Sequence, residues 1–221
     1  SILGKFKALS TIRFNLRLFI RQNNIYWFHV SSLGEYYQIT SILKSIRQID
    51  PTIKIVVSFT SSSGYEYARN DLFDLKIYLP FDFIWVINKA LNMIRPTKII
   101  FSSYDIWFNF LFLARIKNIE VILTSLVIDD NSNKHKKVIK SFYQTLYKNL
   151  DIIHVVTKRD KKNLITILGP YSHNIKIFVS GNPRVDYIKD EFQNSSKDIK
   201  KLKILERENI IIIASTHDED D

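Results

Sequence analysis

A carboxylate follows a short apolar run near the start of the chain. Residues 27–35 read Trp-Phe-His-Val-Ser-Ser-Leu-Gly-Glu, so two hydroxyls and a glycine separate the apolar run from Glu35. The run 25–30 predicts a buried strand, and the apolar spacing over 36–49 predicts a helix. Glu35 is therefore expected at a strand-to-helix turn, where parallel sheets bind ligands and a helix start favours an ionised carboxylate. Such a carboxylate is a candidate general base for an attacking hydroxyl.

The same stretch has a purely structural interpretation. Ser32 and Glu35 are spaced as a capping box, in which both side chains satisfy amides that a helix start leaves without partners. These residues alone do not separate a general base from a helix cap, so both interpretations stand.

A second carboxylate, Asp105, follows the fourth predicted strand and takes a comparable position at the sheet edge. Two carboxylates at one edge can divide proton transfer and substrate positioning between them. Asp105 is equally suited to be the N-cap of the helix that is expected next. The candidate catalytic pair is thus Glu35 and Asp105.

Three polar turns are candidates for ligand binding. The turn 61–64, Ser-Ser-Ser-Gly, can offer hydroxyls and helix amides to a phosphate or sugar, but it can also be a simple helix cap. It lacks the lysine of a P-loop and the glycine pattern of a dinucleotide site. Arg184, in the turn 181–184, is suited to bidentate binding of a carboxylate or phosphate. The alternative is that this segment is a turn with a structural role only. His217 closes the last predicted strand and is either a ligand-binding or an exposed residue.

Composition narrows the classes of function. The chain has 221 residues, no cysteine and a net charge of +10. The absence of cysteine excludes a disulfide framework and a thiolate metal site. The five histidines are scattered, none is paired at i, i+4, and no G-x-S-x-G elbow is present, so neither a metal site nor a hydrolase triad is predicted. The positive charge calls for an anionic partner: nucleic acid, membrane phosphate or anionic sugar.

Apolar runs alternate with helical patterns from residue 25 onward. Strict alternation of this kind predicts right-handed βαβ units and an α/β fold with a doubly wound parallel sheet. The strands are expected at 25–30, 53–59, 75–79, 98–101, 121–125, 152–156 and 175–179. The helices between them are expected at 36–49, from 65, and at 83–94, 106–117, 134–149 and 160–168.

The two ends of the chain differ from this core. Residues 1–24 are expected to form a basic amphipathic helix in which Arg13, Arg17 and Arg21 share a face, as in a helix that lies on an anionic membrane or in an ordinary solvated first helix. Residues 25–189 are expected to form the Rossmann-like, acceptor-binding domain. Residues 190–221 are expected to be a polar linker and the first strand, 209–214, of a truncated second domain. The chain starts without Met and ends just after that strand, so a fragment cut at both ends is expected. No apolar run reaches the roughly 18 residues of a spanning helix.

Six segments, taken in order, resemble the 3-deoxy-D-manno-octulosonic acid (Kdo) transferases of lipopolysaccharide synthesis, which have the two-domain GT-B fold. The segment 27–35 is similar to that family's WxHxxSxGE motif, and the order of all six carries the resemblance more than any single one. The other five are 63–66 (Ser-Gly-Tyr-Glu), 79–82 (Leu-Pro-Phe-Asp), 105–109 (Asp-Ile-Trp-Phe-Asn), 181–186 (Gly-Asn-Pro-Arg-Val-Asp) and 214–217 (Ala-Ser-Thr-His).

The resemblance implies an inverting transfer of Kdo from CMP-Kdo to a lipid A precursor, lipid IVA, with no metal or cofactor. It places Glu35 as the general base and Asp105 at the second acidic position. It implies a protein on the cytoplasmic face of the inner membrane, with an anionic membrane and not nucleic acid as its macromolecular partner. The implied acceptor side holds Ser32, Gly34, Ser63 and Gly64, and the implied donor side holds Arg184, Ser215, Thr216 and His217. Alone, the fragment would be inactive, because both halves of a GT-B enzyme must close over the donor.

Several positions depart from the family pattern. Asp105 replaces a Glu, Arg184 replaces a Lys, and Ser103 stands where many members have another acid. The segment 125–129, Ser-Leu-Val-Ile-Asp, lacks the amide and the arginine of the usual N-x-R-x-S, which leaves room for reduced or altered activity. Two alternatives therefore remain: another GT-B glycosyltransferase with a different nucleotide-sugar donor, and a non-enzymatic basic Rossmann-like module that binds anions.

Overall fold

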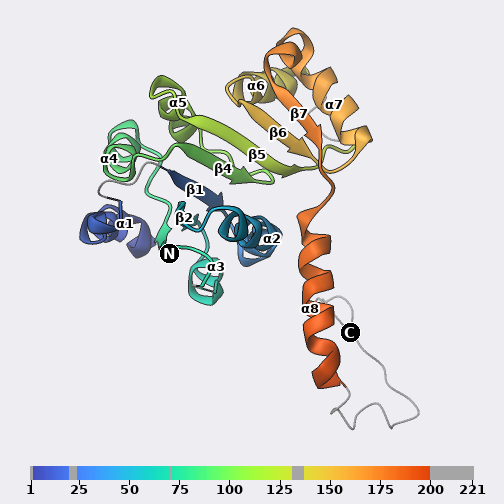
Figure 1. The fold of residues 1–221 in the computed structure, drawn as a ribbon. Helices are drawn as coiled ribbons and strands as arrows, with labels where there is room; N and C mark the ends of the chain where they lie inside the picture. Colours follow the sequence, from blue (N-terminus) through green and yellow to red (C-terminus); the bar gives the residue numbers. More distant parts are fainter. Residues whose placement is uncertain (1, 20–23, 70, 131–136, 200–221) are drawn as a thin grey trace, which may run out of the picture. The chain divides into compact units, whose positions relative to one another are not determined.

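The fold is built on one sheet of seven parallel strands with helices on both faces (Figure 1). The structure, a computed structural model, describes residues 2–19, 24–69, 71–130 and 137–199. The strand order is β3-β2-β1-β4-β5-β6-β7, which is doubly wound and confirms the predicted fold class. The strands are β1 (Ile25–Val30), β2 (Lys54–Phe59), β3 (Leu75–Tyr78), β4 (Lys98–Ser102), β5 (Glu120–Leu126), β6 (Ile152–Val155) and β7 (Lys176–Val179).

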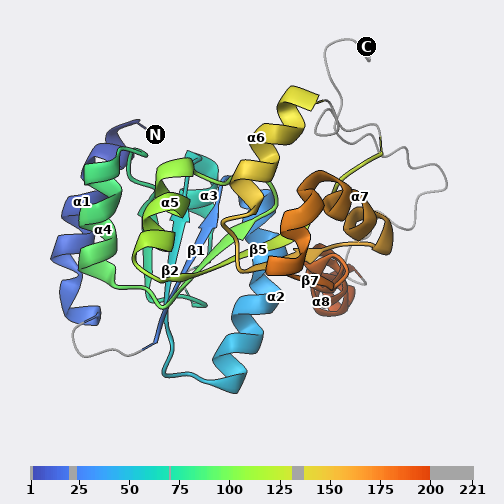
Figure 2. The same cartoon turned by 90° about the horizontal axis from the view of Figure 1, so that it is seen from above.

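Helices connect the strands in βαβ order. Among them, α1, α4 and α5 lie side by side in both ribbon views (Figures 1 and 2). The helices are α1 (Ile2–Phe14), α2 (Leu33–Ile49), α3 (Ser62–Tyr67), α4 (Ile84–Ile94), α5 (Phe108–Ile116), α6 (Lys137–Tyr147), α7 (Lys158–Leu168) and α8 (Pro183–Ile199), with short 3-10 turns at Leu16–Leu18 and Gly169–Asn174.

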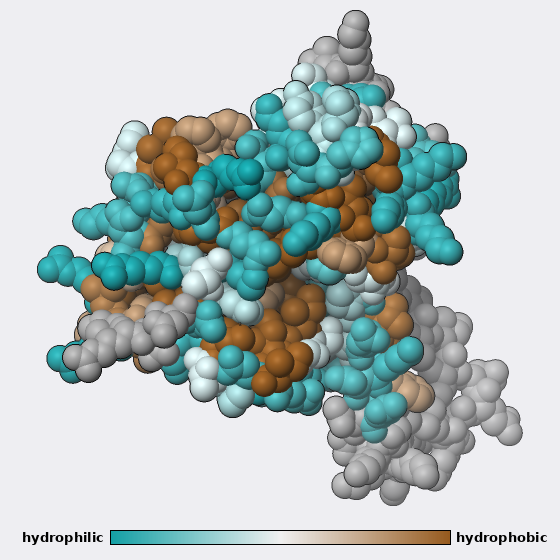
Figure 3. All heavy atoms as spheres, turned by 45° about the horizontal axis from the view of Figure 1, so that its top comes forward, coloured by the Kyte–Doolittle hydropathy of each residue, from teal (hydrophilic) through white to brown (hydrophobic). Residues whose placement is uncertain are grey.

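The sheet separates two apolar cores. Neighbouring strand residues point to opposite faces, so Trp27 packs into one core and Phe28 into the other. β1 and β2 are buried almost throughout, which explains why their sequences are continuous apolar runs. Outside the cores, apolar surface gathers in patches between hydrophilic side chains (Figure 3).

The N-terminal helix differs from its prediction. It ends at Phe14; Arg17 lies in the following 3-10 turn, and residue 21 is outside the described residues, so the prediction of one continuous helix carrying the three arginines is wrong. Phe6 is 70% exposed. The chain buries Ala8 and Ile12 instead.

Other element boundaries need correction too: α3, predicted to start at 65, begins at Ser62. α2 begins at Leu33, three residues earlier than predicted, which places Glu35 inside its first turn. Residues 190–199, predicted as linker, continue α8. The predicted strand 209–214 lies outside the described residues. By its contacts the chain forms two compact units, Ser1–Tyr187 and Ile188–Asp221, and the whole sheet belongs to the first. In the described part of the chain, no helix combines the length and apolarity that crossing a membrane requires.

Candidate active site

The switch point of the sheet lies between β1 and β4. The chain runs from β1 outward to β3 and then returns to place β4 on the other side of β1. In open α/β sheets, ligands bind at the carboxyl ends of the strands that flank this point. Glu35 follows the end of β1 and Asp105 follows the end of β4, so the strand order brings both candidate carboxylates to this edge.

Glu35 is fixed by Ser31, the residue that directly follows β1. Its Oε2 accepts hydrogen bonds from the backbone N of Ser31 at 2.5 Å and from the Ser31 hydroxyl at 2.7 Å. Ser32 is the N-cap of α2, and its Oγ accepts from the Glu35 backbone N at 3.3 Å. Because the Glu35 side chain bonds Ser31 and not the N-cap amide, half of the predicted capping box is present. The carboxylate is partly exposed at the helix start, where the dipole favours its charge.

Asp105 is not a helix cap. The N-cap of α5 is Trp107, whose side chain makes no capping bond. The Asp105 carboxylate faces the sheet instead, where its Oδ2 lies 3.1 Å from His29 Nε2 and accepts from Thr60 Oγ1 at 3.2 Å. The side chain keeps 27% of its surface exposed. Asp105 is therefore anchored on β1 and on the end of β2 while it remains open to solvent.

The environment of Asp105 favours the charged carboxylate. Burial raises its pKa, but hydrogen bonds from His29, Trp107 and Thr60 and the electrostatic effect of His29 together outweigh burial and hold this pKa below its ordinary value. Asp105 is thus a carboxylate at neutral pH, suited to orient or attract a group and not to donate a proton.

Sequence reasoning missed His29 as a site residue. It is completely buried, its Nδ1 lies 2.9 Å from Ser58 Oγ, and Trp27 Nε1 donates to the same oxygen at 2.9 Å. Trp107 Nε1 lies 3.2 Å from His29 Nε2. The available signal was a histidine within an otherwise apolar strand, because a buried polar group needs partners.

The segment 61–64 abuts the turn that carries Glu35. The Ser61 backbone N donates to Ser31 O at 2.9 Å, and Ser61 is the N-cap of α3, accepting from the Gly64 backbone N. A Cβ on Gly64 would lie 3.2 Å from the carbonyl carbon of Ser32 and 2.7 Å from the Phe59 ring. Gly64 therefore allows close approach of two turns. Ser63 and Gly64 lie within α3 itself, and Ser63 is exposed.

Two serines at the ends of β4 and β5 have left-handed backbone conformations. Ser103 has φ 61° and Ser125 has φ 59°. Ser103 Oγ donates to Gln38 Oε1 at 2.8 Å, which ties the end of β4 to α2. Ser125 Oγ is buried and has no hydrogen-bond partner among the described residues. Since such conformations cost energy in non-glycine residues and collect at functional sites, they mark the same sheet edge.

Of the four predicted donor-side residues, only Arg184 lies in the described part of the chain. Arg184 lies in the first turn of α8; its side chain is exposed and its backbone N donates to Asn182 Oδ1 at 3.0 Å. Ser215, Thr216 and His217 are outside the described residues. Gly34 lies in the first turn of α2, and a Cβ there would come no closer than 3.8 Å to Ser32 Oγ.

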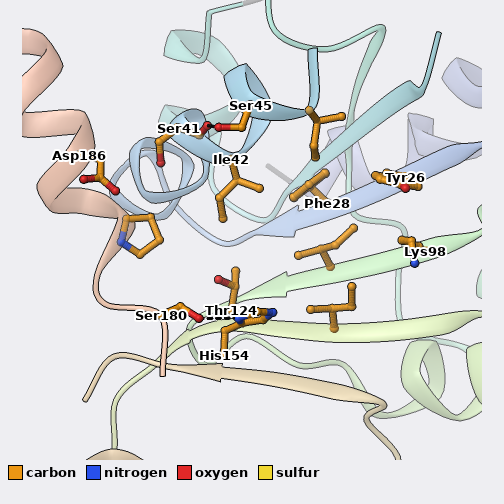
Figure 4. Close-up of a pocket in the computed structure, with 14 residues that line it drawn as sticks. Tyr26, Phe28, Ser41, Ile42, Ser45, Lys98, Thr124, His154, Ser180 and Asp186 are labelled. Carbon is orange, nitrogen blue, oxygen red and sulfur yellow. Dashed lines mark hydrogen bonds between the residues drawn. The ribbon is translucent and has the colours of Figure 1, made fainter. Parts of the chain in front are cut away.

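A cavity of about 460 Å³ opens elsewhere, over the face of the sheet (Figure 4). Phe28 and Ile42 line its apolar part, and His154 hydrogen-bonds Ser180 Oγ at 2.6 Å on its polar side. None of the predicted site residues that the structure describes lines this cavity. It is therefore distinct from the sheet edge that carries Glu35 and Asp105, which we call the carboxylate edge.

The parallel sheet, with two carboxylates at its switch point, defines a Rossmann-like α/β domain. A sequence model described as "3-Deoxy-D-manno-octulosonic-acid transferase (kdotransferase)" matches residues 10–187, and the chain belongs to this family.

Curated relatives carry the same name. The chain is 29% identical over 199 residues to the 3-deoxy-D-manno-octulosonic acid transferase of Chlamydia muridarum, a match that covers 88% of this chain and 45% of that protein. It is 26% identical to the enzyme of Chlamydia trachomatis serovar A, covering 98% and 51%, and 24% identical to that of Haemophilus influenzae, covering 87% and 45%. The chain thus spans about half the length of these relatives.

Solved structures share the fold. A UDP-GlcNAc 2-epimerase from Neisseria meningitidis matches with a TM-score of 0.57 at 14% identity, covering 80% of this chain and 52% of that one. A putative UDP-N-acetylglucosamine 2-epimerase from Listeria monocytogenes matches with a TM-score of 0.52 at 15% identity, covering 75% and 46%. At these identities the likeness shows the fold alone.

Proposed function

We propose that the protein to which this chain belongs is an inverting glycosyltransferase that moves Kdo from CMP-Kdo to a lipid A precursor, lipid IVA, with Glu35 as the general base. Membership of the Kdo transferase family supports the reaction class. The observation that carries the residue assignment is the anchoring of both carboxylates on the end of β1: Ser31 holds Glu35, and His29, two residues earlier, holds Asp105.

The proposed step balances with Glu35 alone as the proton acceptor. An acceptor hydroxyl oxygen attacks the anomeric carbon of Kdo, and the bond from that carbon to the CMP phosphate oxygen breaks with its electron pair. The hydroxyl proton passes to Glu35, and attack from the face opposite CMP inverts the anomeric centre. Both hydrogen bonds that fix Glu35 end on Oε2, so Oε1 is the oxygen that would take the proton. Asp105, as a fixed anion, would orient the acceptor.

A lipid acceptor requires a site close to a membrane. α1, α4 and α5 contain five basic residues, Lys5, Lys7, Arg13, Lys89 and Arg115, and no acidic residue. The first five residues of each of these helices also include exposed apolar side chains, which together with Phe83, just before α4, we call the aromatic face. It consists of Ile2, Leu3, Phe6, Phe83, Ile84, Trp85, Phe108 and Phe112. Aromatic and basic side chains together suit an anionic bilayer surface.

The aromatic face continues into the candidate active site. Phe6 packs edge-on against Phe81 at 4.9 Å between ring centroids, and Lys5 Nζ lies 5.0 Å from the ring centroid of Trp107. Trp107 in turn reaches His29 at the carboxylate edge. We therefore infer a peripheral protein on the cytoplasmic leaflet of the bacterial inner membrane, with its catalytic edge beside the lipid surface.

Replacing Glu35 tests this proposal. We expect Glu35→Gln in the full-length protein to abolish Kdo transfer from CMP-Kdo to lipid IVA while binding to anionic vesicles stays unchanged. Glu120→Gln is the matched control, because Glu120 pairs with Lys98 at the opposite, amino end of the sheet and should retain transfer. Undiminished turnover of Glu35→Gln would end the general-base assignment. Transfer from a UDP-sugar in place of CMP-Kdo would favour another glycosyltransferase activity.

A further inference from the structure

We propose that His29 is a positioning residue for the reaction: its Nε2–H fixes the Asp105 carboxylate, and Trp27 and Ser58 fix the tautomer of His29. This inference rests on the proposed function, because it assigns His29 a part in chemistry at the carboxylate edge. The proposal is carried by a continuous set of hydrogen bonds that runs from the sheet interior to the edge.

His29 acts through another residue and not by touching substrate. Its side chain has no exposed surface, and it lies beside the Phe101 ring at 6.0 Å between centroids. Asp105, its partner at 3.1 Å, is the member of the pair that reaches solvent. Any effect of His29 on a reaction at the edge is therefore transmitted by Asp105.

The direction of the hydrogen bonds follows from donor chemistry. Trp27 Nε1 can only donate, so Ser58 Oγ accepts from it at 2.9 Å. The Ser58 hydroxyl hydrogen then has two acceptors, His29 Nδ1 at 2.9 Å and Phe28 O at 3.3 Å, and the shorter contact favours His29. When Nδ1 accepts, a neutral imidazole carries its hydrogen on Nε2, which faces Asp105.

The opposite tautomer conflicts with an ionised Asp105. Trp107 Nε1, 3.2 Å from His29 Nε2, is able to donate to that nitrogen if it carries no hydrogen. The Nε2 lone pair would then face the Asp105 carboxylate at 3.1 Å with no hydrogen between them, which is repulsive in a buried site. An ionised Asp105 thus selects the Nε2–H form. In that form Asp105 Oδ2 receives hydrogen bonds from both His29 and Thr60. Trp107 Nε1–H, which cannot donate to a protonated Nε2, is left to donate to the same carboxylate, and these donors fix its orientation.

Two substitutions of His29 separate positioning from packing. Gln places its amide nitrogen near the position of imidazole Nε2 and keeps a donor toward Asp105. Asn is one methylene shorter, so its amide can reach the Ser58 hydroxyl but cannot donate to Asp105. Both variants remove a ring of the same size, so their effects on packing are comparable.

The experiment measures Kdo transfer by both variants in the full-length protein, with Asp105→Asn in parallel. We expect His29→Asn to lower kcat by about 10- to 100-fold, the effect of losing one hydrogen bond to a charged group, with KM for CMP-Kdo unchanged. His29→Gln should retain most of kcat. Equal activity of the Gln and Asn variants, whether both fall or neither does, overturns the proposal.

A readout without activity keeps this inference apart from the proposed function. In ¹⁵N NMR spectra of the unmodified protein at neutral pH, we expect the His29 ring to show hydrogen on Nε2 and not on Nδ1. Hydrogen on Nδ1 alone overturns the positioning role even if Asp105→Asn abolishes transfer. Full transfer by Asp105→Asn instead removes Asp105 from the proposed function, while the tautomer still reports on the hydrogen bonds of His29.

Discussion

Gly64 in α3 lies against the backbone of Ser32, with 3.2 Å between the position of a Cβ on Gly64 and the carbonyl carbon of Ser32. The backbone bond from Ser61 N to Ser31 O joins the same two turns. Two segments that are about 30 positions apart in the sequence therefore form one structural unit around Glu35.

This contact predicts that Gly64→Ala destabilises the fold. The new methyl group would meet the Phe59 ring at 2.7 Å and the Ser32 backbone, so we expect a loss of about 1–3 kcal/mol in the free energy of unfolding, measured with urea. Gly34→Ala is the matched control. Its methyl group would have 3.8 Å of space in a helix, where Ala is favoured over Gly by up to about 1 kcal/mol. Equal stabilities of the two variants would contradict this packing.

Asp82 joins two further segments of the family pattern, and its loss should destabilise the start of α5. Its Oδ2 accepts from Asn109 N and its Oδ1 accepts from Phe110 N, each at 3.0 Å. Both amides belong to the first turn of α5, which has no side-chain cap of its own. We expect Asp82→Ala to cost about 1–2 kcal/mol and Asp82→Asn less, because the amide oxygen still accepts. Thermal unfolding monitored by circular dichroism would check this order; identical midpoints would refute it.

The stabilisation provided by Asp74 should depend on pH. Arg47 Nη2 lies 2.6 Å and Lys54 Nζ 2.9 Å from its carboxylate oxygens, and the Ile55 backbone N donates at 2.8 Å. Burial raises the pKa of Asp74, but the hydrogen bonds from these three groups outweigh burial and lower the pKa below 3.8. A carboxyl group whose pKa is lowered by folding stabilises the folded state at pH values above its ordinary pKa. This stabilisation is lost as the pH falls through the pKa of the folded state.

We therefore expect Asp74→Asn to lower the free energy of unfolding by about 1–3 kcal/mol at pH 7. The difference from the unmodified protein should shrink as pH falls below about 3.8, because the unfolded state then binds a proton that the folded state still resists, and it should vanish only when the folded carboxyl is protonated as well. Urea titrations at pH 7 and pH 3 measure the two differences. A difference that is the same at both values would mean that packing, and not charge, accounts for the effect.

Much of the fold can be predicted from the sequence because its strands are buried on both faces. A strand such as β1, Ile25–Val30, then appears as a continuous apolar run, and its predicted bounds agree with the structure. Helix boundaries are harder, since first turns are polar: α2 starts at Leu33 and includes residues that resemble a loop. α8 was predicted in part as a linker because residues 190–199 are rich in charge and amide side chains.

The candidate site could be predicted from the sequence only in part. Glu35 and its partner Ser31 are four positions apart, so local sequence suggests their interaction. His29 and Asp105 are 76 positions apart, and His29 and Ser58 are 29 apart. No local pattern contains such contacts; they exist because β1 pairs with both β2 and β4. For the same reason, the sequence could not distinguish a capping Asp105 from one that faces the sheet.

The aromatic face predicts a specific defect in membrane binding. Phe108 in α5 is 51% exposed and lies in this face, whereas Phe142 in α6 is 59% exposed and lies outside it. We expect Phe108→Ser to weaken binding to vesicles that contain anionic lipid by about three- to tenfold, because burying part of a phenyl ring contributes about 1 kcal/mol. Phe142→Ser, the matched control, should bind like the unmodified protein in a vesicle sedimentation assay.

Salt distinguishes the apolar from the charged contribution of this face. Lys5 and Lys7 attract an anionic surface through a field that salt screens within about 8 Å at physiological ionic strength, so raising the salt should weaken binding of all variants by a similar factor. The ratio between Phe108→Ser and the unmodified protein should persist, because apolar burial does not depend on that field. If both phenylalanine variants bind equally well at every salt concentration, the protein reaches the bilayer by another surface, and the carboxylate edge need not lie beside the lipid.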